Sequence, residues 1–364
     1  MPLQCGIVGL PNVGKSTLFN ALSRAGAASA NYPFCTIEPN VGTVAVPDPR
    51  LDRIAELSRS AKITPTTIEF VDIAGLVAGA SKGEGLGNQF LAHIREVDAI
   101  VHVVRCFHDD QVTHVSETID PVRDIEVIET ELMLKDLDTI ERRVERAARA
   151  AKGGDRKARE EEAFFHRLLD HVADGRPVRQ FERTKEEEPL LRSLSLLSVK
   201  PVLYAANVGE DDLPDGNAYV DRVREIAATE DAVVIVVSAE LEAQIAELDD
   251  DEREAFIEEL GLHEAGLDRL IHAAYRLLGL ITFFTTGPKE TRAWTLNRGT
   301  TAQKAAGEIH SDFERGFIRA ETIKYDAFLN YKGESGARDA GAMRAEGREY
   351  IVQDGDLLLF RFNV

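Results

Sequence analysis

The stretch GLPNVGKST at residues 9–17 decides how this chain folds. It matches the phosphate-loop pattern G-x-x-x-x-G-K-[ST] at every fixed position. The apolar run at residues 3–8 predicts a short buried strand before it, and residues 16–23 predict a helix after it. Glycines let the backbone between them curve around an anion, with N–H groups directed at phosphate oxygens. We therefore predict a nucleotide site at the helix N-terminus; a glycine-rich turn without a ligand is the alternative.

Two side chains of this loop carry the chemistry. Lys15 can reach the β- and γ-phosphates of a nucleoside triphosphate, so we predict it as a catalytic residue. The Ser16 hydroxyl can ligate Mg²⁺, which prefers oxygen ligands. The cofactor predicted from the loop is therefore Mg²⁺.

Composition and charge narrow the class of protein. The 364 residues suggest two or three domains, and no apolar run is long enough to cross a bilayer, so we expect no membrane partner. The N-terminus enters a core strand directly, which argues against a signal peptide. Three cysteines without metal-ligand or disulfide spacing favour a reducing, cytoplasmic location.

The net charge of −20 is unevenly distributed along the chain. Residues 128–198 hold 15 basic and 16 acidic side chains, and residues 276–364 hold 13 and 12. Most of the negative charge lies elsewhere, which argues against a nucleotide-binding core that grips nucleic acid, and we expect no specific DNA partner. The two near-neutral segments are better placed to approach a polyanion.

Two further segments have the features of nucleotide-dependent switches. Residues 25–43 have little periodicity and read as a long functional loop, in which Thr36 can ligate Mg²⁺ when the γ-phosphate is present. An ordinary loop role for Thr36 is the alternative. Residues 67–75 form an apolar strand that ends in D-x-x-G. Asp72 can hold Mg²⁺ through water, and the Gly75 N–H can turn toward the γ-phosphate as a catalytic group.

The residue after this motif is unusual for a nucleotidase. Leu76 stands where many GTPases have a glutamine that orients the attacking water, and leucine cannot hydrogen-bond water. Hydrolysis is then slow, or another group positions the water. His93 on the following helix is a candidate, although a lone histidine at helical spacing is more often an exposed polar residue.

The middle of the chain predicts a helical insertion within an α/β domain. Residues 99–105, 201–207 and 232–238 are apolar runs typical of a parallel sheet. Residues 125–147 predict a long amphipathic helix, which is followed by helices around residues 164–172 and 190–197. A hairpin of this kind can serve packing alone or can act as a lever or docking arm. The predicted segments are residues 1–127 and 199–277 for the nucleotide-binding (G) domain, 128–198 for the inserted helical domain, and 278–364 for a C-terminal domain.

The sequence also predicts the base of the nucleotide. Binding residues of open α/β sheets follow the carboxyl ends of strands, which places Asn207, Val208, Ser238 and Ala239 near the base. Guanine-specific relatives carry N-K-x-D where this chain has NVGE at residues 207–210. The paired acceptor for guanine is lost or displaced, and backbone groups near Val208 with the Asn207 amide suit adenine. Since unpaired buried polar groups are costly, we predict ATP as substrate, with GTP weaker.

The C-terminal segment predicts a small mixed sheet around one helix. Strands are expected at residues 280–286, 292–296 and 357–362, with a helix at residues 301–310. Six basic side chains of this segment allow two interpretations: they form one basic face, or they are scattered charges that only keep the surface soluble. They are Lys289, Arg292, Arg298, Lys304, Arg315 and Lys324.

Taken together, these blocks of sequence closely resemble the YchF/Obg-like ATPase family of translation-factor-related P-loop proteins, over essentially the whole chain. The matching blocks are GLPNVGKST at 9–17, NYPFCTIEPNVG at 31–42, DIAGLV at 72–77, GLGN at 85–88, IREVDAI at 94–100, NVGE at 207–210, GPKETRAWT at 287–295, IHSDFERGFIRAE at 309–321 and the terminal FRFNV.

The resemblance implies a G domain, an inserted helical domain and a C-terminal ubiquitin-like (β-grasp) TGS domain. It implies ATP hydrolysis in preference to GTP, binding to the ribosome including its large subunit, and a role in translation and stress response. Val208 would contact adenine, and Leu76 fits the family's apolar residue at that place. The phosphate-binding residues would be Asn12, Val13, Gly14, Lys15, Ser16 and Thr17, and the Mg²⁺ ligands Ser16 and Thr36.

Three functional hypotheses follow. The first is an ATPase switch that docks on the ribosome, which we expect to act as a monomer. The second is an Obg-type GTPase, which differs in base choice. The third is a binding module in which nucleotide stabilises the fold without being hydrolysed, and Leu76 motivates it.

Overall fold

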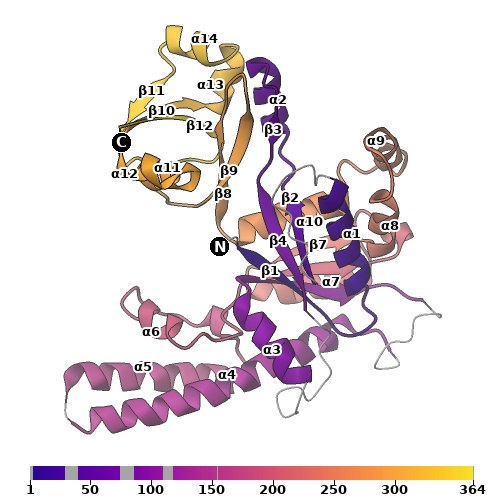
Figure 1. Ribbon diagram of the computed structural model, residues 1–364. Coiled ribbons are helices and arrows are strands. Elements are labelled where there is room, and N and C mark those ends of the chain that lie inside the picture. Colours follow the sequence, from indigo (N-terminus) through magenta and orange to yellow (C-terminus); the bar gives the residue numbers. More distant parts are fainter. Residues whose placement is uncertain (1–2, 29–39, 74–85, 110–117, 154, 364) are drawn as a thin grey trace. The chain divides into compact units, whose positions relative to one another are not determined.

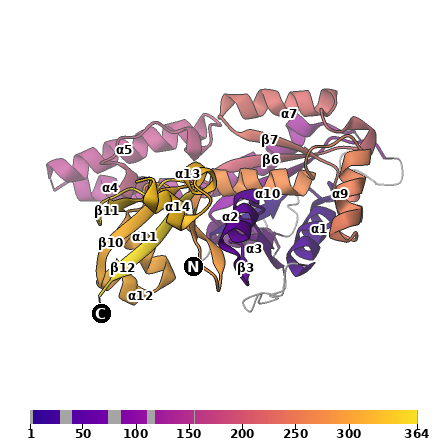
Figure 2. The ribbon, with the colours of Figure 1, turned by 90° about the horizontal axis from the view of Figure 1, so that it is seen from above.

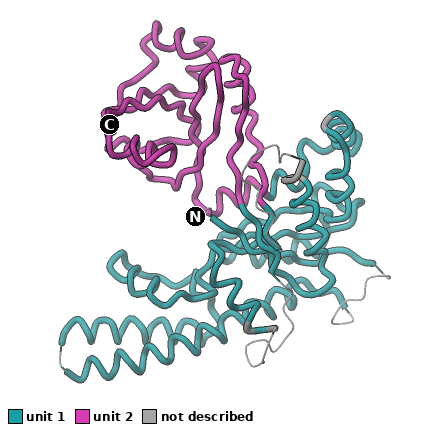
Figure 3. The backbone as a smooth tube through the Cα atoms, viewed as in Figure 1, with its two compact units in different colours: residues 1–24, 37–42, 69–270 teal, residues 25–36, 43–68, 271–364 magenta. Residues whose placement is uncertain are grey.

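A computed structural model describes residues 3–28, 40–73, 86–109, 118–153 and 155–363 of the chain. These residues divide into two compact units, shown in Figure 3. Unit 1 comprises residues 1–24, 37–42 and 69–270, and unit 2 comprises residues 25–36, 43–68 and 271–364. Sequence reasoning did not assign residues 43–68 to the C-terminal unit. The three predicted domain boundaries, at residues 127/128, 198/199 and 277/278, stay a prediction.

Unit 1 is built on the sheet that carries the phosphate loop (Figure 1). The strand order is β2-β4-β1-β5-β6-β7, and the pairs β1–β4, β1–β5, β5–β6 and β6–β7 are all parallel. Strands β2 and β4 contribute residues to both units. The strands are β1 (Gln4–Val8), β2 (Val41–Ala45), β4 (Thr67–Asp72), β5 (Ala99–Arg105), β6 (Val202–Asn207) and β7 (Val233–Val237). The predicted α/β class with a mostly parallel sheet is confirmed.

Helices connect these parallel strands, as crossover connections require. They are α1 (Lys15–Ala28), α3 (Leu86–Glu96) and α7 (Ala218–Thr229), with a short η2 turn (Glu210–Asp212). Three more helices follow β7, the last strand of this sheet along the chain: α8 (Ala239–Ile245), α9 (Asp250–Glu259) and α10 (Gly266–Leu277). Helix α1 extends to Ala28, which corrects the expectation that a loop begins at residue 25. The sequence from Arg24 to Ala28 contains three alanines, the strongest helix formers, and they continue the helix.

The inserted segment forms a helical hairpin within unit 1, as Figures 1 and 2 both show. Helix α4 (Pro121–Ala151) packs against α5 (Arg156–Ala173), and their shared core contains Ile140, Phe164 and Leu168. A turn, η1 (Val178–Gln180), and a short helix, α6 (Glu188–Arg192), follow. The expected helix through residues 190–197 is therefore too long, because Ser195 takes a left-handed conformation with φ of 50°.

Unit 2 holds a mixed sheet with strand order β11-β10-β12-β8-β9-β3. Its strands are β3 (Ile63–Thr64), β8 (Leu280–Thr285), β9 (Thr291–Asn297), β10 (Phe317–Lys324), β11 (Arg344–Glu346) and β12 (Asp356–Phe362). Helix α11 (Ala302–Ile309) packs its alanines against this sheet, together with Phe283 and Phe360. This is the sheet around one helix that the sequence predicts, with β3, β10 and β11 added. The other helices are α2 (Pro49–Ser58), α12 (Ser311–Arg315), α13 (Tyr325–Asn330) and α14 (Glu334–Asp339).

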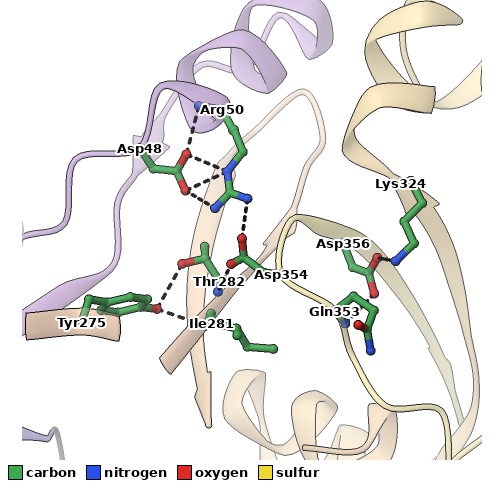
Figure 4. Close-up of polar contacts among 9 residues, drawn as sticks. All are labelled: Asp48, Arg50, Tyr275, Ile281, Thr282, Lys324, Gln353, Asp354 and Asp356. Atoms are coloured by element: carbon green, nitrogen blue, oxygen red, sulfur yellow. Dashed lines mark hydrogen bonds and ion pairs between the residues drawn. The ribbon is translucent and has the colours of Figure 1, made fainter. Parts of the chain in front are cut away.

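Polar contacts explain why helix α2 belongs to unit 2 (Figure 4). Asp48 caps α2 by accepting a hydrogen bond from the Arg50 N–H, and the Arg50 guanidinium pairs with both Asp48 and Asp354 at 2.8 Å. Asp354 in turn accepts from the Thr282 N–H at 2.9 Å. The Tyr275 hydroxyl donates to the Ile281 carbonyl oxygen at 3.0 Å. Segments far apart in sequence are thus joined by charge-assisted hydrogen bonds, which are among the stronger kinds.

A buried histidine in unit 1 makes the stability of the fold dependent on pH. His102 in β5 is 1% exposed and lies against Tyr204, with ring centroids 5.6 Å apart. Burial, followed by the positive charge of Arg179, lowers the pKa of His102 to about 3. The folded chain therefore resists protonation of this ring, whereas the unfolded chain accepts a proton near its ordinary pKa of about 6.5.

We expect the free energy of unfolding to fall as the pH falls below about 6.5, with a contribution from His102 of up to ~1.4 kcal/mol per pH unit. The stabilisation from His102 is complete above the pKa that this histidine has in the unfolded chain. It is lost as the pH falls toward the pKa of His102 in the folded chain. Urea denaturation of the wild type and of His102→Gln between about pH 5 and pH 7.5 measures this difference, which should narrow as the pH falls. His93→Gln, at an exposed histidine, is the matched control and should follow the wild-type slope. Parallel wild-type and His102→Gln curves would contradict the assignment.

Candidate functional site

The candidate site lies at the carboxyl edge of the unit 1 sheet, where several strands end side by side. In the parallel register, Ile7 lies opposite Asp72, Val8 opposite His102, and Asn207 opposite both Arg105 and Val237. Because all of these strands run in the same direction, the residues that follow them meet at one edge. This is the edge at which open α/β sheets bind ligands.

The phosphate loop connects β1 to α1 through two left-handed residues. Asn12 has a φ of 64° and Gly14 a φ of 91°, and the first helical hydrogen bond runs from the Leu18 N–H to the Gly14 carbonyl oxygen at 3.0 Å. A Cβ atom at Gly14 would lie 2.2 Å from Nδ2 of Asn207, so only glycine fits there. The loop therefore has the backbone geometry in which N–H groups form an anion-binding concavity.

Lys15 and Asp72 lie together at this edge. Lys15 is 8% exposed, and its Nζ atom forms an ion pair with Oδ1 of Asp72. Asp72 ends β4, and its backbone N–H donates to the Asn40 carbonyl oxygen at 2.8 Å. The structure thus brings together the lysine predicted to contact phosphates and the carboxylate predicted at the Mg²⁺ site. Sequence reasoning did not predict that the two form an ion pair.

Asn207 braces the loop against the neighbouring elements. Its Nδ2 atom donates to the Val13 carbonyl oxygen at 2.9 Å, and its Oδ1 atom accepts from the Ala239 N–H at 2.9 Å. Asn207 is 4% exposed, and Ser238 and Ala239 beside it are also buried. Two of the predicted residues, Asn207 at the end of β6 and Ala239 at the start of α8, therefore do lie against the phosphate loop. Their contacts show that Asn207 positions backbone groups, which the sequence pattern alone did not indicate.

The region predicted to contact the base follows Asn207. Val208 is 3% exposed, and its N–H donates to the Val237 carbonyl oxygen at 2.9 Å. Its carbonyl oxygen accepts no hydrogen bond from the part of the chain that the structure describes. Glu210, which takes the place of the guanine-binding aspartate, is exposed in the η2 turn.

The remaining predicted residues are placed as follows. Ser16 and Thr17 are exposed in the first turn of α1, and His93 is exposed in the last turn of α3. Thr36, Gly75 and Leu76 lie outside the described residues.

Sequence reasoning missed one buried charged residue near the site. Arg105 ends β5 and is 2% exposed; its Nε atom donates to the Phe107 carbonyl oxygen at 3.2 Å, and its guanidinium lies 4.5 Å from the centre of the Phe107 ring. The available signal was an arginine at the end of a strand that is apolar apart from His102. These contacts hold the backbone that follows β5.

The residues at this edge fit a nucleoside triphosphate with Mg²⁺. A left-handed loop, a helix N-terminus and a buried lysine suit phosphate groups. The Ser16 hydroxyl and the Asp72 carboxylate are the hard oxygen donors that Mg²⁺ prefers. Among the described residues, no cluster of three or more His, Cys, Asp or Glu side chains suits a metal ion. No helix in the described ranges is long and apolar enough to span a membrane.

Comparison with known proteins agrees with this geometry. Residues 4–139 match a family described as "50S ribosome-binding GTPase", and residues 280–363 match the family YchF-GTPase_C, described as a protein of unknown function. The "Ribosome-binding ATPase YchF" of Escherichia coli O157:H7 is 58% identical over 364 residues, covering 100% of both chains. The protein of the same name from Bacillus subtilis is 57% identical over 366 residues, again with 100% of both chains covered.

A solved structure shares the whole architecture. The Schizosaccharomyces pombe YchF GTPase superposes with a TM-score of 0.90 at 36% identity, covering 99% of this chain and 97% of the other. Full-length relatives above half identity, together with this fold, establish the relationship. The chain belongs to the YchF family of P-loop nucleotide-binding proteins.

Proposed function

We propose that this protein is a Mg²⁺-dependent ATP hydrolase that works as a slow molecular switch. The observation that carries the proposal is the phosphate loop, whose left-handed backbone places the buried Lys15 at the N-terminus of α1. Relatives named as ATPases and a structural neighbour titled a GTPase both support triphosphate hydrolysis. Because their names differ in the nucleotide, the choice between adenine and guanine is argued from the residues of the site.

The proposed roles follow from the positions of the residues. Backbone groups of residues 12–17 bind the phosphates, and Lys15 stabilises their charge during transfer. Ser16 and Asp72, with Thr36, would hold Mg²⁺, which when bound supplies neutralisation of the phosphate oxygens. The Gly75 N–H is assigned to the γ-phosphate. Leu76 cannot orient water, so His93 stays a candidate for that role and slow turnover is expected.

Adenine preference is the finer part of the proposal. Both ends of the Asn207 amide are hydrogen-bonded within the protein, so we assign it a positioning role. The Val208 carbonyl oxygen can accept a hydrogen bond from the adenine amino group. Guanine would need a paired acceptor for its N1–H and 2-amino groups, and the exposed Glu210 is a longer side chain than the aspartate that provides one.

We expect ATP to bind at least about tenfold more tightly than GTP in the presence of Mg²⁺, because an unpaired guanine donor costs more than ~1.4 kcal/mol. Isothermal calorimetry with non-hydrolysable analogues of both nucleotides measures the difference, and repeating it with a chelator tests the metal. Equal or tighter GTP binding would exclude the adenine assignment and favour an Obg-type GTPase.

The proposed partner is the ribosome, through its large subunit, and the proposed setting is the cytoplasm, in translation and the stress response. The relatives' names and the family matched by residues 4–139 support this proposal. Cosedimentation with purified large subunits at low salt, in ATP- and ADP-bound states, tests it. If the protein stays in the supernatant in every nucleotide state, under conditions in which the subunits pellet completely, ribosome binding is excluded. Analytical ultracentrifugation of the free chain tests the proposed monomer.

A further inference from the structure

The far end of the α4–α5 hairpin carries basic side chains that nucleotide hydrolysis does not use. We define the hairpin tip as residues 142–153 and 155–159. It holds eight lysines and arginines against two acidic residues, whereas residues 128–141 and 160–198 hold seven against fourteen. The near-neutral insertion is therefore strongly polarised, with its positive charge concentrated at the tip.

Helix geometry produces this concentration. Helix α4 ends at Ala151 and α5 begins at Arg156, so the last turns of one helix and the first turn of the other lie at the same end of the hairpin (Figures 1 and 2). Val144, Ala147 and Ala151 are buried, which directs the charged positions between them toward solvent. At ~1.5 Å per residue, α4 is about 45 Å long, and both views show the tip projecting away from the sheet of unit 1.

Most of these charges are not neutralised within the protein. Arg149 pairs with Glu145 at 3.3 Å and Arg156 with Glu160 at 2.8 Å, yet the two arginine side chains remain 74% and 92% exposed. Surface pairs of this type contribute little stability and exchange partners readily. Five further basic side chains of the tip, all outside the buried core, make no ion pair with any described residue: Arg142, Arg146, Lys152, Lys157 and Arg159.

The chemistry of the tip selects a phosphodiester backbone as its partner, and the proposed ribosome binding makes that backbone RNA. The tip contains no aromatic residue on which a base could stack, so single-stranded recognition through bases is not favoured. None of the exposed large hydrophobic side chains lies in the tip, which lacks the apolar anchor of a membrane-binding helix. Arginine and lysine on a rigid helical scaffold suit the closely spaced phosphates of a duplex.

We propose that the hairpin tip binds the phosphate backbone of structured RNA and provides one of the ribosome contacts. This inference rests on the proposed ribosome binding for its biological target. Outside the tip and the near-neutral residues 276–364, the chain is strongly acidic and repels a polyanion, so within unit 1 the tip is the surface best suited to approach one. Binding is expected to be independent of RNA sequence and to weaken steeply with salt.

The experiment compares two triple variants with the same change in charge. Arg146→Gln, Lys152→Gln and Lys157→Gln together alter the tip. Arg176→Gln, Lys185→Gln and Arg192→Gln together are the matched control, at exposed positions after α5. The probes are a fluorescein-labelled RNA duplex of about 20 base pairs, which exceeds the footprint of one binding module, and purified large ribosomal subunits.

We expect the tip variant to bind the duplex at least about tenfold more weakly than the wild type at low salt. The salt dependence of its binding should also be weaker, with the magnitude of the negative slope of log K against log salt reduced by about two to three. The control should stay within about twofold of the wild type. ATP turnover and circular dichroism should match the wild type in both variants, because neither set touches the phosphate loop.

The outcomes separate this inference from the proposed function. If the wild type and the tip variant pellet equally with the large subunit and bind the duplex with equal affinity, the tip assignment is overturned while ribosome binding stands. Tip-dependent duplex binding without cosedimentation would support the RNA assignment and remove the ribosome as its target. Wild-type binding to vesicles of anionic lipid without duplex binding would overturn RNA as the partner.

Discussion

Replacing Lys15 by alanine is expected to lower the ATP turnover number by at least about 100-fold, the usual effect of removing one preorganised charge-stabilising donor. Lys15 is buried at the start of α1 and is the cation beside the Asp72 carboxylate. Without it, the negative charge that develops on the phosphate oxygens has no ammonium partner. Steady-state phosphate release with saturating Mg²⁺ and ATP measures the loss.

A second lysine provides the control for this substitution. Lys185 is exposed and far from the loop in sequence, so Lys185→Ala should keep wild-type turnover. Turnover in Lys15→Ala within about threefold of the wild type would refute the role of Lys15. A wild type that binds ATP but releases no phosphate would instead favour the binding module without hydrolysis, which Leu76 motivates.

The largest expected effect on stability comes from Arg179, at the base of the hairpin. Its guanidinium pairs with Glu129 of α4 at 3.0 Å and with Glu230 after α7, whose other oxygen accepts from the Tyr204 hydroxyl at 2.5 Å. The three charged side chains are between 3% and 12% exposed. Burial alone would lower the pKa of Arg179, but the charges of Glu129 and Glu230 outweigh it and raise that pKa.

Arg179→Ala should lower the free energy of unfolding by about 3–5 kcal/mol, because it leaves two buried carboxylates without their cation. Burial already raises the pKa of Glu129, and Arg179 opposes that rise. Loss of Arg179 therefore favours the protonated, neutral form of Glu129 further. The destabilisation should accordingly be smaller near pH 5 than near pH 8, since acid neutralises the unpaired group. Urea denaturation at both pH values measures it.

Two further variants serve as comparisons for Arg179→Ala. Arg176→Ala, three residues earlier at a side chain 55% exposed, should change stability by less than about 0.5 kcal/mol. Arg179→Met combined with Glu129→Gln and Glu230→Gln removes the whole charge set and should recover much of the loss, because breaking a buried pair costs more than replacing it. A triple variant as unstable as Arg179→Ala would show that packing, and not the unpaired charge, explains the effect.

A feature of the structure could be predicted from the sequence when the residues that produce it lie close together along the chain. The phosphate loop is specified within nine residues, because glycine conformation, one lysine and the flanking strand and helix patterns are all contained there. The strands β1, β5, β6 and β7 were equally readable as apolar runs. By contrast, β10 was missed, since its sequence FIRAETIK does not alternate strictly between polar and apolar residues and lies within a charged segment. The ends of α1 and α6 were misplaced because boundaries depend on single residues.

The sequence by itself determined the class of fold, the phosphate-loop motif and the family, because short-range patterns and backbone chemistry suffice for them. Only the tertiary structure decided how distant residues act together. Asn207 braces Val13 across nearly two hundred positions, and Arg179 joins Glu129 to Glu230. The charge of the insertion averages almost to zero along the chain, yet folding two helices back on each other gathers its basic residues at one end. Charge and hydrogen bonding act through space, and distance in space is set by the fold.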